Sequence, residues 1–110
     1  MSGIVGTSSS KSKLINFTVD TAAAWARFNG NTPALLQSFN ISTLDDLGGT
    51  GNWRLNFTNP MRTGNFCVVA CSSQSMELVG TTASASVTIE TRNGDNNASD
   101  TDKISVAVFI

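Results

Sequence analysis

Oxygen-bearing side chains gather in one stretch of the sequence, from Asn93 to Asp102. Carboxylate, amide and hydroxyl oxygens are the ligands that Ca²⁺ prefers in proteins. The spacing here matches no calcium loop, because the glycine at the sixth position and the closing bidentate glutamate are both absent. We interpret the stretch as a solvated loop, and a cation site is the alternative.

The sequence offers no other group of side chains suited to catalysis. It contains no histidine, which removes the commonest general base, the Ser-His triads and most zinc sites. The stretch Gly48-Gly49-Thr50-Gly51 lacks the Gly-Lys-Ser/Thr of a phosphate-binding loop, so it indicates a hairpin turn. We therefore expect neither an enzyme nor a bound cofactor.

Two cysteines, Cys67 and Cys71, lie four residues apart on a predicted strand. In an extended chain this spacing is about 13 Å, whereas a disulfide needs Cα atoms within about 7 Å. We expect two free, buried thiols, as suits assembly in a reducing cytoplasm.

Charge and composition limit the classes of partner. The formal net charge is −1 and only 14% of the residues are charged, which argues against nucleic-acid binding. A mostly neutral surface favours packing against other subunits. The first residues lack the basic segment and the apolar run of a signal peptide, and no apolar run of about 18 residues occurs, so we expect no membrane insertion.

Both tryptophans stand near arginines, which raises the possibility of a sugar-stacking platform. Trp25 is followed by Arg27, and Trp53 by Arg54. We favour aromatic side chains in the core or at a subunit interface.

The residues from Leu35 to Cys71 are expected to form the central sheet. Apolar and polar residues alternate at Trp53, Leu55 and Phe57, which is the period of a strand with one buried face. Three successive strands are predicted, and the last, an almost continuous apolar run, is expected to be the most buried. Their ranges are Leu35–Ser42, Asn52–Thr58 and Asn65–Ser72.

Further strands are predicted on both sides of this stretch. They span Leu14–Val19, Ala24–Phe28, Thr82–Thr91 and Ile104–Ile110, and Met76–Val79 is either a loop or a short edge strand. The last strand should bury the C-terminal apolar residues in the sheet. About seven strands with turn residues between them predict an all-β domain over residues 14–110, an antiparallel β-sandwich that is jelly-roll-like or a flattened barrel.

Residues 1–13 are predicted to be an extended N-terminal arm, because they are rich in glycine and serine and have Ile4 and Val5 as their apolar pair. Such a composition is typical of a flexible segment. The arm is either a disordered terminus or an attachment segment that becomes ordered when Ile4 and Val5 dock on another protein.

The order of several short strings resembles a family of bacteriophage virion domains. The strings are Ala24-Trp-Ala-Arg-Phe-Asn-Gly30, Ser38-Phe-Asn-Ile-Ser42, Gly51-Asn-Trp-Arg-Leu-Asn-Phe-Thr-Asn-Pro-Met61 and Asn65-Phe-Cys-Val-Val69. The resemblance extends over roughly residues 14–110. Arg27, Trp53 and the pair Phe66-Cys67 depart from the residues that are usual in that family.

Such domains occur in tail fibres, tail tips and related appendages, and the resemblance implies a non-enzymatic, commonly trimeric module. We therefore predict a virion protein, assembled in the host cytoplasm, that binds other virion proteins through its own arm. Loops 29–33, 43–52 and 92–103 would face outward toward host polysaccharide or protein. The candidate contact residues are Ile4, Val5, Asn29, Asn31, Asp45, Asp46, Asn93, Asp95, Asn96 and Asn97. The alternatives are a capsid decoration protein and a free carbohydrate-binding module.

Overall fold

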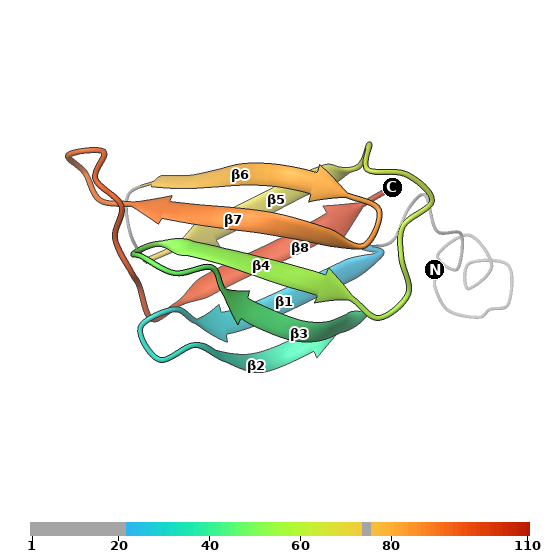
Figure 1. Cartoon of the computed structure of the whole chain (residues 1–110), viewed down its shortest axis with the longest axis horizontal. Helices are drawn as coiled ribbons and strands as arrows, with labels where there is room; N and C mark the ends of the chain where they lie inside the picture. The colour runs from blue at the N-terminus through green and yellow to red at the C-terminus, as the bar shows by residue number, and fades with distance from the viewer. Residues whose placement is uncertain (1–21, 74–75) are drawn as a thin grey trace, which may run out of the picture.

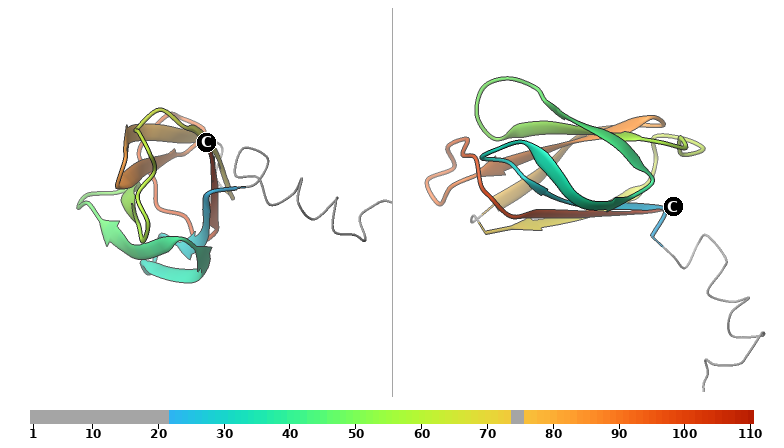
Figure 2. Two further views of the ribbon diagram at one scale, coloured as in Figure 1. Left: turned by 90° about the vertical axis from the view of Figure 1, so that its right-hand side faces the viewer. Right: turned by 90° about the horizontal axis from the view of Figure 1, so that it is seen from below.

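The computed structural model describes residues 22–73 and 76–110, and this part of the chain is a sandwich of two antiparallel four-stranded sheets (Figures 1 and 2). Sheet A has the strand order β2-β1-β8-β5, and sheet B has the order β3-β4-β7-β6. The strands are β1 Ala24–Asn29, β2 Ala34–Phe39, β3 Ile41–Asp46, β4 Asn52–Phe57, β5 Cys67–Ser72, β6 Met76–Ala83, β7 Ser86–Arg92 and β8 Ile104–Phe109. The predicted all-β sandwich is confirmed.

The core lies between the four inner strands β1, β8, β4 and β7. Every second residue of these strands is buried, because successive side chains of a strand point to opposite faces. Phe28 of sheet A and Trp53 of sheet B meet edge to face across the core, with ring centroids 5.7 Å apart. The alternation that predicts strands at Trp53–Phe57 therefore also identifies the buried face.

The predicted strand Leu35–Ser42 is two strands that belong to different sheets. The chain turns at Asn40, whose φ of 59° lies in the left-handed region, which asparagine tolerates better than most residues. The Asn40 side chain fixes this corner, because its amide donates to the carbonyl oxygens of Ala23 and Asn59 and its Oδ1 accepts from the Asn59 N–H. One residue thus ends β2 in sheet A and starts β3 in sheet B.

The expected three-stranded central sheet is therefore wrong. β3 pairs with β4 in sheet B, whereas β5 lies in sheet A beside β8. The chain crosses between the sheets through residues 58–66, where Pro60 cannot donate to a ladder and Met61 is buried with its N–H bonded to the Ser84 carbonyl.

β5 is not the most buried strand. Its residues alternate between exposed and half-buried, because it is an edge strand of sheet A and its outer face has no neighbouring layer. Cys67 and Cys71 are free thiols, as predicted, but both are exposed rather than buried. An apolar run alone does not distinguish a strand buried on both faces from one with an uncovered apolar face.

The remaining strand predictions are partly confirmed. Residues 76–83 form the edge strand β6, longer than the short edge considered from the sequence. The predicted strand Thr82–Thr91 is divided by a turn before Ser86, so only Val87 and Ile89 of its apolar face are buried. Ile110 is 46% exposed, so the terminal residue is not covered by the sheet. The predicted strand Leu14–Val19 and the arm with Ile4 and Val5 lie outside the described residues.

Candidate functional site

Three loops that are far apart in the sequence meet at one end of the sandwich (Figure 1). We call this the loop end: residues 30–33 between β1 and β2, 47–51 between β3 and β4, and 93–103 between β7 and β8. Direct hydrogen bonds join them. The Gly30 N–H donates to the Thr101 carbonyl at 2.8 Å, and the Gly51 N–H donates to Asp100 Oδ1 at 2.7 Å. The three loops thus form one connected surface.

Buried groups anchor the loop end to the core. Gly30 lies against the Trp53 indole so closely that a Cβ at this position would stand 2.3 Å from Trp53 Cζ2. Thr91 and Thr101 are the buried polar residues of the described chain, and the Thr91 hydroxyl donates to the Ser99 carbonyl. These contacts hold the 93–103 loop in place, because a buried hydroxyl without a partner costs free energy.

Asn93 shapes the loop between β7 and β8. Its Oδ1 accepts from the backbone N–H of Asp95 at 2.9 Å and of Asn97 at 3.1 Å, and Asn96 adopts a positive φ of 64°. The side chains of Asp95, Asn96 and Asn97 are left exposed at the tip. Of the candidate residues in this loop, Asn93 is therefore structural, and the other three are available to a partner.

Asn29 has the equivalent role between β1 and β2. Its Oδ1 accepts from the N–H of Asn31 at 2.8 Å and of Thr32 at 3.1 Å. Asn31 itself is exposed. Asparagine at the start of a turn stabilises it in this way, so Asn31 is the candidate contact that this loop presents.

The placement of Asp45 and Asp46 in a loop is wrong, because both are the last residues of β3. The hairpin is shorter than predicted, since Gly48, Gly49 and Gly51 take positive φ angles and reverse the chain in few residues. Asp46 still borders the loop end, where its Oδ1 accepts from the Gly48 N–H at 3.0 Å.

Asp45 instead belongs to a polar network on the outer face of sheet B. Its Oδ2 accepts from Asn56 Nδ2 at 2.8 Å and from Arg54 at 2.9 Å. The hydrogen bond from Asn56, followed by that from Arg54, holds the pKa of the Asp45 carboxyl below its ordinary value. The outward residues of β4 and β7 are likewise polar. They are Asn52, Arg54, Asn56, Ser86, Thr88 and Glu90.

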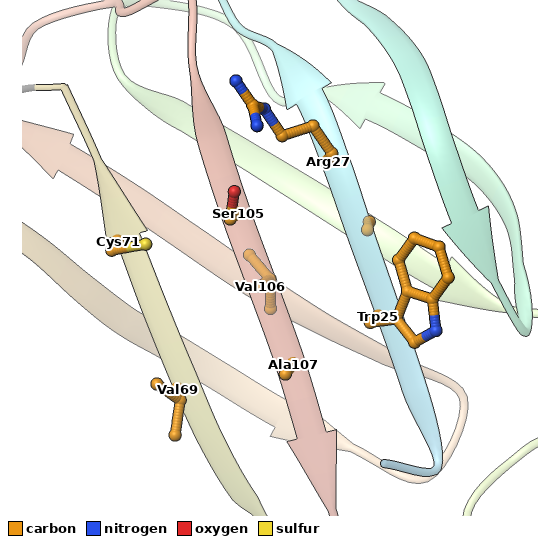
Figure 3. Close-up of a pocket in the computed structure, with 8 residues that line it drawn as sticks. Trp25, Arg27, Val69, Cys71, Ser105, Val106 and Ala107 are labelled. Atoms are coloured by element: carbon orange, nitrogen blue, oxygen red, sulfur yellow. The ribbon is translucent and has the colours of Figure 1, made fainter.

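The outer face of sheet A has the opposite character. Figure 3 shows an open groove of about 290 Å³ on this face, with Trp25 and Arg27 of β1 on one side and Val69 and Cys71 of β5 on the other. Small side chains of β8 form its floor. Trp25 is 40% exposed and Val69 is 57% exposed. The groove is open and smaller than most small-molecule sites, which measure roughly 300–1,000 Å³.

The apolar outer face of sheet A was not predicted from the sequence. The two tryptophans, expected in the core or at an interface, differ in position. Trp53 is buried in the core, and Trp25 lies on the uncovered face. The one available signal was that Cys67, Val69 and Cys71 give β5 apolar residues on the face opposite to Val68 and Ala70. An almost continuous apolar run predicts a deeply buried strand, but here one of its two faces is exposed.

The chain enters the described domain at the end opposite to the loop end. β1 starts at Ala24 and reaches the loop end at Asn29, and the preceding Ala23 N–H donates to the Val108 carbonyl at 2.7 Å. The C-terminus lies at this same end (Figure 1). The two ends of the sandwich therefore differ: the described chain begins and ends at one of them, and the three loops lie at the other.

Within residues 22–73 and 76–110, no three histidine, cysteine, aspartate or glutamate side chains come together as they would around a metal ion. The described part of the chain also has no helix long and apolar enough to span a membrane. No protein-family model, curated protein or solved structure matches the chain.

Proposed function

We propose that this protein is a structural component of a bacteriophage virion, an oligomeric module of a tail fibre, tail tip or other appendage that contacts the host surface. The observation that carries the proposal is the difference between the two ends of the sandwich. The loops with exposed polar side chains meet at one end, and the chain enters from the other. The resemblance of the sequence to phage appendage domains gives this arrangement its biological setting.

The loop end has the chemistry for contact with polysaccharide or protein. Asn31, Asn96 and Asn97 present amides that both donate and accept hydrogen bonds, and Asp95 adds acceptors. Asn29 and Asn93 hold the loops in shape through their own side chains, so the exposed groups are offered by a fixed backbone. Fixed loops lose less conformational entropy when a ligand binds.

The opposite end suits attachment. Residues 1–13, with Ile4 and Val5, precede the described domain in the sequence, and the first described strand, β1, begins at this end. Docking of this arm on another virion protein would leave the loop end pointing away from the particle. Contacts between copies of the chain would use the sides of the sandwich.

Mass spectrometry of purified particles tests the proposal. We expect the chain in the particles at a copy number far below that of the major capsid protein. A copy number comparable to the capsid protein would instead identify a decoration protein, and absence from the particles would overturn a virion role altogether.

A set of substitutions tests the role of the loop end. Replacing Asn31, Asp95 and Asn97 with alanine should reduce adsorption of phage to its host while particle assembly is unchanged. The matched control replaces Arg62 and Asn65, which are exposed at the opposite end, and should leave adsorption unaffected. Equal adsorption by both sets of particles would contradict the assignment of the loop end.

A further inference from the structure

Three of the four edge strands of the sandwich have features that discourage pairing with another chain. The register between each edge strand and its neighbour is interrupted at β2, at β3 and at β6. β3 also ends in two aspartates, Asp45 and Asp46. Bulges and charged side chains of this kind keep the edges of natural sheets from joining.

β5, the other edge strand of sheet A, has none of these features. Its residues, Cys67–Ser72, pair with β8 in an unbroken register and include no charged residue and no proline. Among the described strands only β8 pairs with it, because β5 is the last strand of sheet A. A straight, uncharged edge is a template for a strand from another chain.

The free edge of β5 presents the backbone groups of Val68 and Ala70. The N–H of Ser73, directly after β5, donates to the Lys103 carbonyl on the β8 side at 3.1 Å. In an antiparallel ladder, residues that bond to the neighbouring strand alternate with residues that do not. The odd-numbered residues of β5 therefore bond to β8, and Val68 and Ala70 direct their N–H and C=O groups to the edge where no described strand lies.

The side chains along this edge are also incompletely covered. Val68 and Ala70 pack against the core but are only half-buried, whereas the inward residues of β1 and β8 are buried. Val69 points to the outer face and is 57% exposed. A strand added here would cover apolar side chains on both faces of the sheet and would also pair the backbone groups.

The sequence of β5 suits pairing with itself, because it is nearly symmetric about Val69. It reads Cys67-Val-Val-Ala-Cys71. In an antiparallel pair with a two-fold axis at Val69, Val68 lies opposite Ala70 of the second copy, so the two edge-directed residues meet as hydrogen-bonded partners. Like charges opposite one another would destabilise such a pair, and none occur here. A two-fold contact also closes on itself and builds no filament.

We propose that β5 pairs with β5 of a second copy of this chain, antiparallel and about a two-fold axis at Val69. The two A sheets then form one continuous eight-stranded sheet. A contact made mainly by one strand of each copy is smaller than the roughly 800 Å² that each partner of a stable complex buries, so the association is reversible and depends on concentration. This pairing goes beyond the proposed function and does not rest on it.

The native thiols report this register. Cys67 lies opposite Cys71 of the second copy, as a non-hydrogen-bonded pair with Cα atoms about 4.5 Å apart, which is within the range of a disulfide. Cys67 and Cys71 of one strand are about 13 Å apart and cannot bond to each other. A bond between residues 67 and 71 therefore joins two chains.

A mixture of two full-length single variants tests the pairing. Cys67→Ser keeps Cys71, and Cys71→Ser keeps Cys67, so the two remaining thiols lie opposite each other only in a mixed pair. Under mild oxidation with diamide, the mixture should give several times more covalent dimer than either variant alone, with the bond identified by peptide mapping. Each variant alone is the matched control, because its thiol lies opposite a serine. Equal yields from the mixture and from either single variant would overturn the proposal.

Charge placed at the axis provides a second measurement. Val69→Lys sets two ammonium groups opposite each other and should raise the dissociation constant of the dimer, measured by sedimentation equilibrium, by about tenfold or more. The control is Phe39→Lys at the opposite edge of sheet A, where Phe39 is 54% exposed, and it should leave the dissociation constant unchanged.

Three results of the sedimentation experiment would overturn the proposal. They are a parent chain that stays monomeric, a parent chain that assembles as a trimer, and equal weakening by Val69→Lys and Phe39→Lys. The last result would assign the contact to the whole outer face of sheet A. These experiments use purified protein, so their failure leaves the particle experiments above untouched.

Discussion

Gly30 provides a sharp test of how the loop end is joined to the core. In the Gly30→Ala variant the new Cβ would stand 2.3 Å from Trp53 Cζ2 and 2.8 Å from the Thr101 carbonyl oxygen. Carbon atoms in ordinary contact are about 3.5–4.0 Å apart. Neither neighbour can yield easily, since Trp53 is only 1% exposed and its ring is held against Phe28.

We expect Gly30→Ala to lower the free energy of unfolding by about 3 kcal/mol, at the upper end of the usual range for over-packed cores. With a urea m-value of about 1.5 kcal/mol/M, the midpoint of unfolding should fall by about 2 M. The assay is urea unfolding followed by circular dichroism at 25 °C.

Gly49→Ala is the matched control. Nothing lies within 4 Å of a Cβ at this position, and its φ is +69°, so only backbone strain of about 1 kcal/mol is expected. In a Trp53→Phe background, the cost of Gly30→Ala should fall markedly, because the obstructing indole atoms are gone. If Gly30→Ala costs no more than Gly49→Ala, or costs the same with and without the indole, the reasoning is refuted.

Three further predictions concern charged and polar groups. Asp100→Ala removes the acceptor of the Gly51 N–H and should lower the free energy of unfolding in urea by about 1.5 kcal/mol. Asp95→Ala at the exposed tip is the control and should change it by less than about 0.5 kcal/mol. Equal effects of the two substitutions would contradict a stabilising hydrogen bond between the two loops. The pKa of Asp45 is lowered in the folded state, so the carboxylate adds stability above its ordinary pKa and loses it as the pH falls through the lowered value. Asp45→Asn should therefore be less stable than the parent at pH 7, and this difference in stability should shrink as the pH falls below the ordinary pKa of an aspartate. A difference that stays the same from neutral to acid pH would be inconsistent with this. Calcium should not raise the melting temperature, because Asn93 and Asp100 already accept backbone N–H groups; a concentration-dependent rise would revive the cation site.

Local periodicity was sufficient to predict the inner strands. Trp53, Leu55 and Phe57 are buried as their alternation indicated, and so are Val87 and Ile89. Each of these strands has one apolar face and lies in the middle of a sheet. The pattern therefore reports burial directly.

The sheet to which each outer strand belongs could not be read in this way. A single left-handed residue, Asn40, transfers the chain from sheet A to sheet B, and nothing in its neighbours' hydropathy marks that change. β5 has apolar residues on both faces, and only the tertiary structure decides that Val69 is uncovered.

The three loops at the loop end could be predicted from the sequence, but the fact that they meet could not. Glycine, asparagine and aspartate predicted the three loops, because these residues favour turns. Their meeting at one end depends on pairings between distant residues, such as Gly51 with Asp100, which have no local signature. Asp45 was misplaced because a hairpin with three glycines reverses in fewer residues than its composition suggested.

Labelling of intact particles tests the central claim most directly. With Cys67 and Cys71 replaced by serine, an Asp95→Cys variant carries its only thiol at the loop end. If the loop end faces outward, a maleimide reagent should modify this thiol on intact particles as completely as on the free protein. Protection of the thiol on particles, with full reaction in the free protein, would contradict an outward-facing loop end.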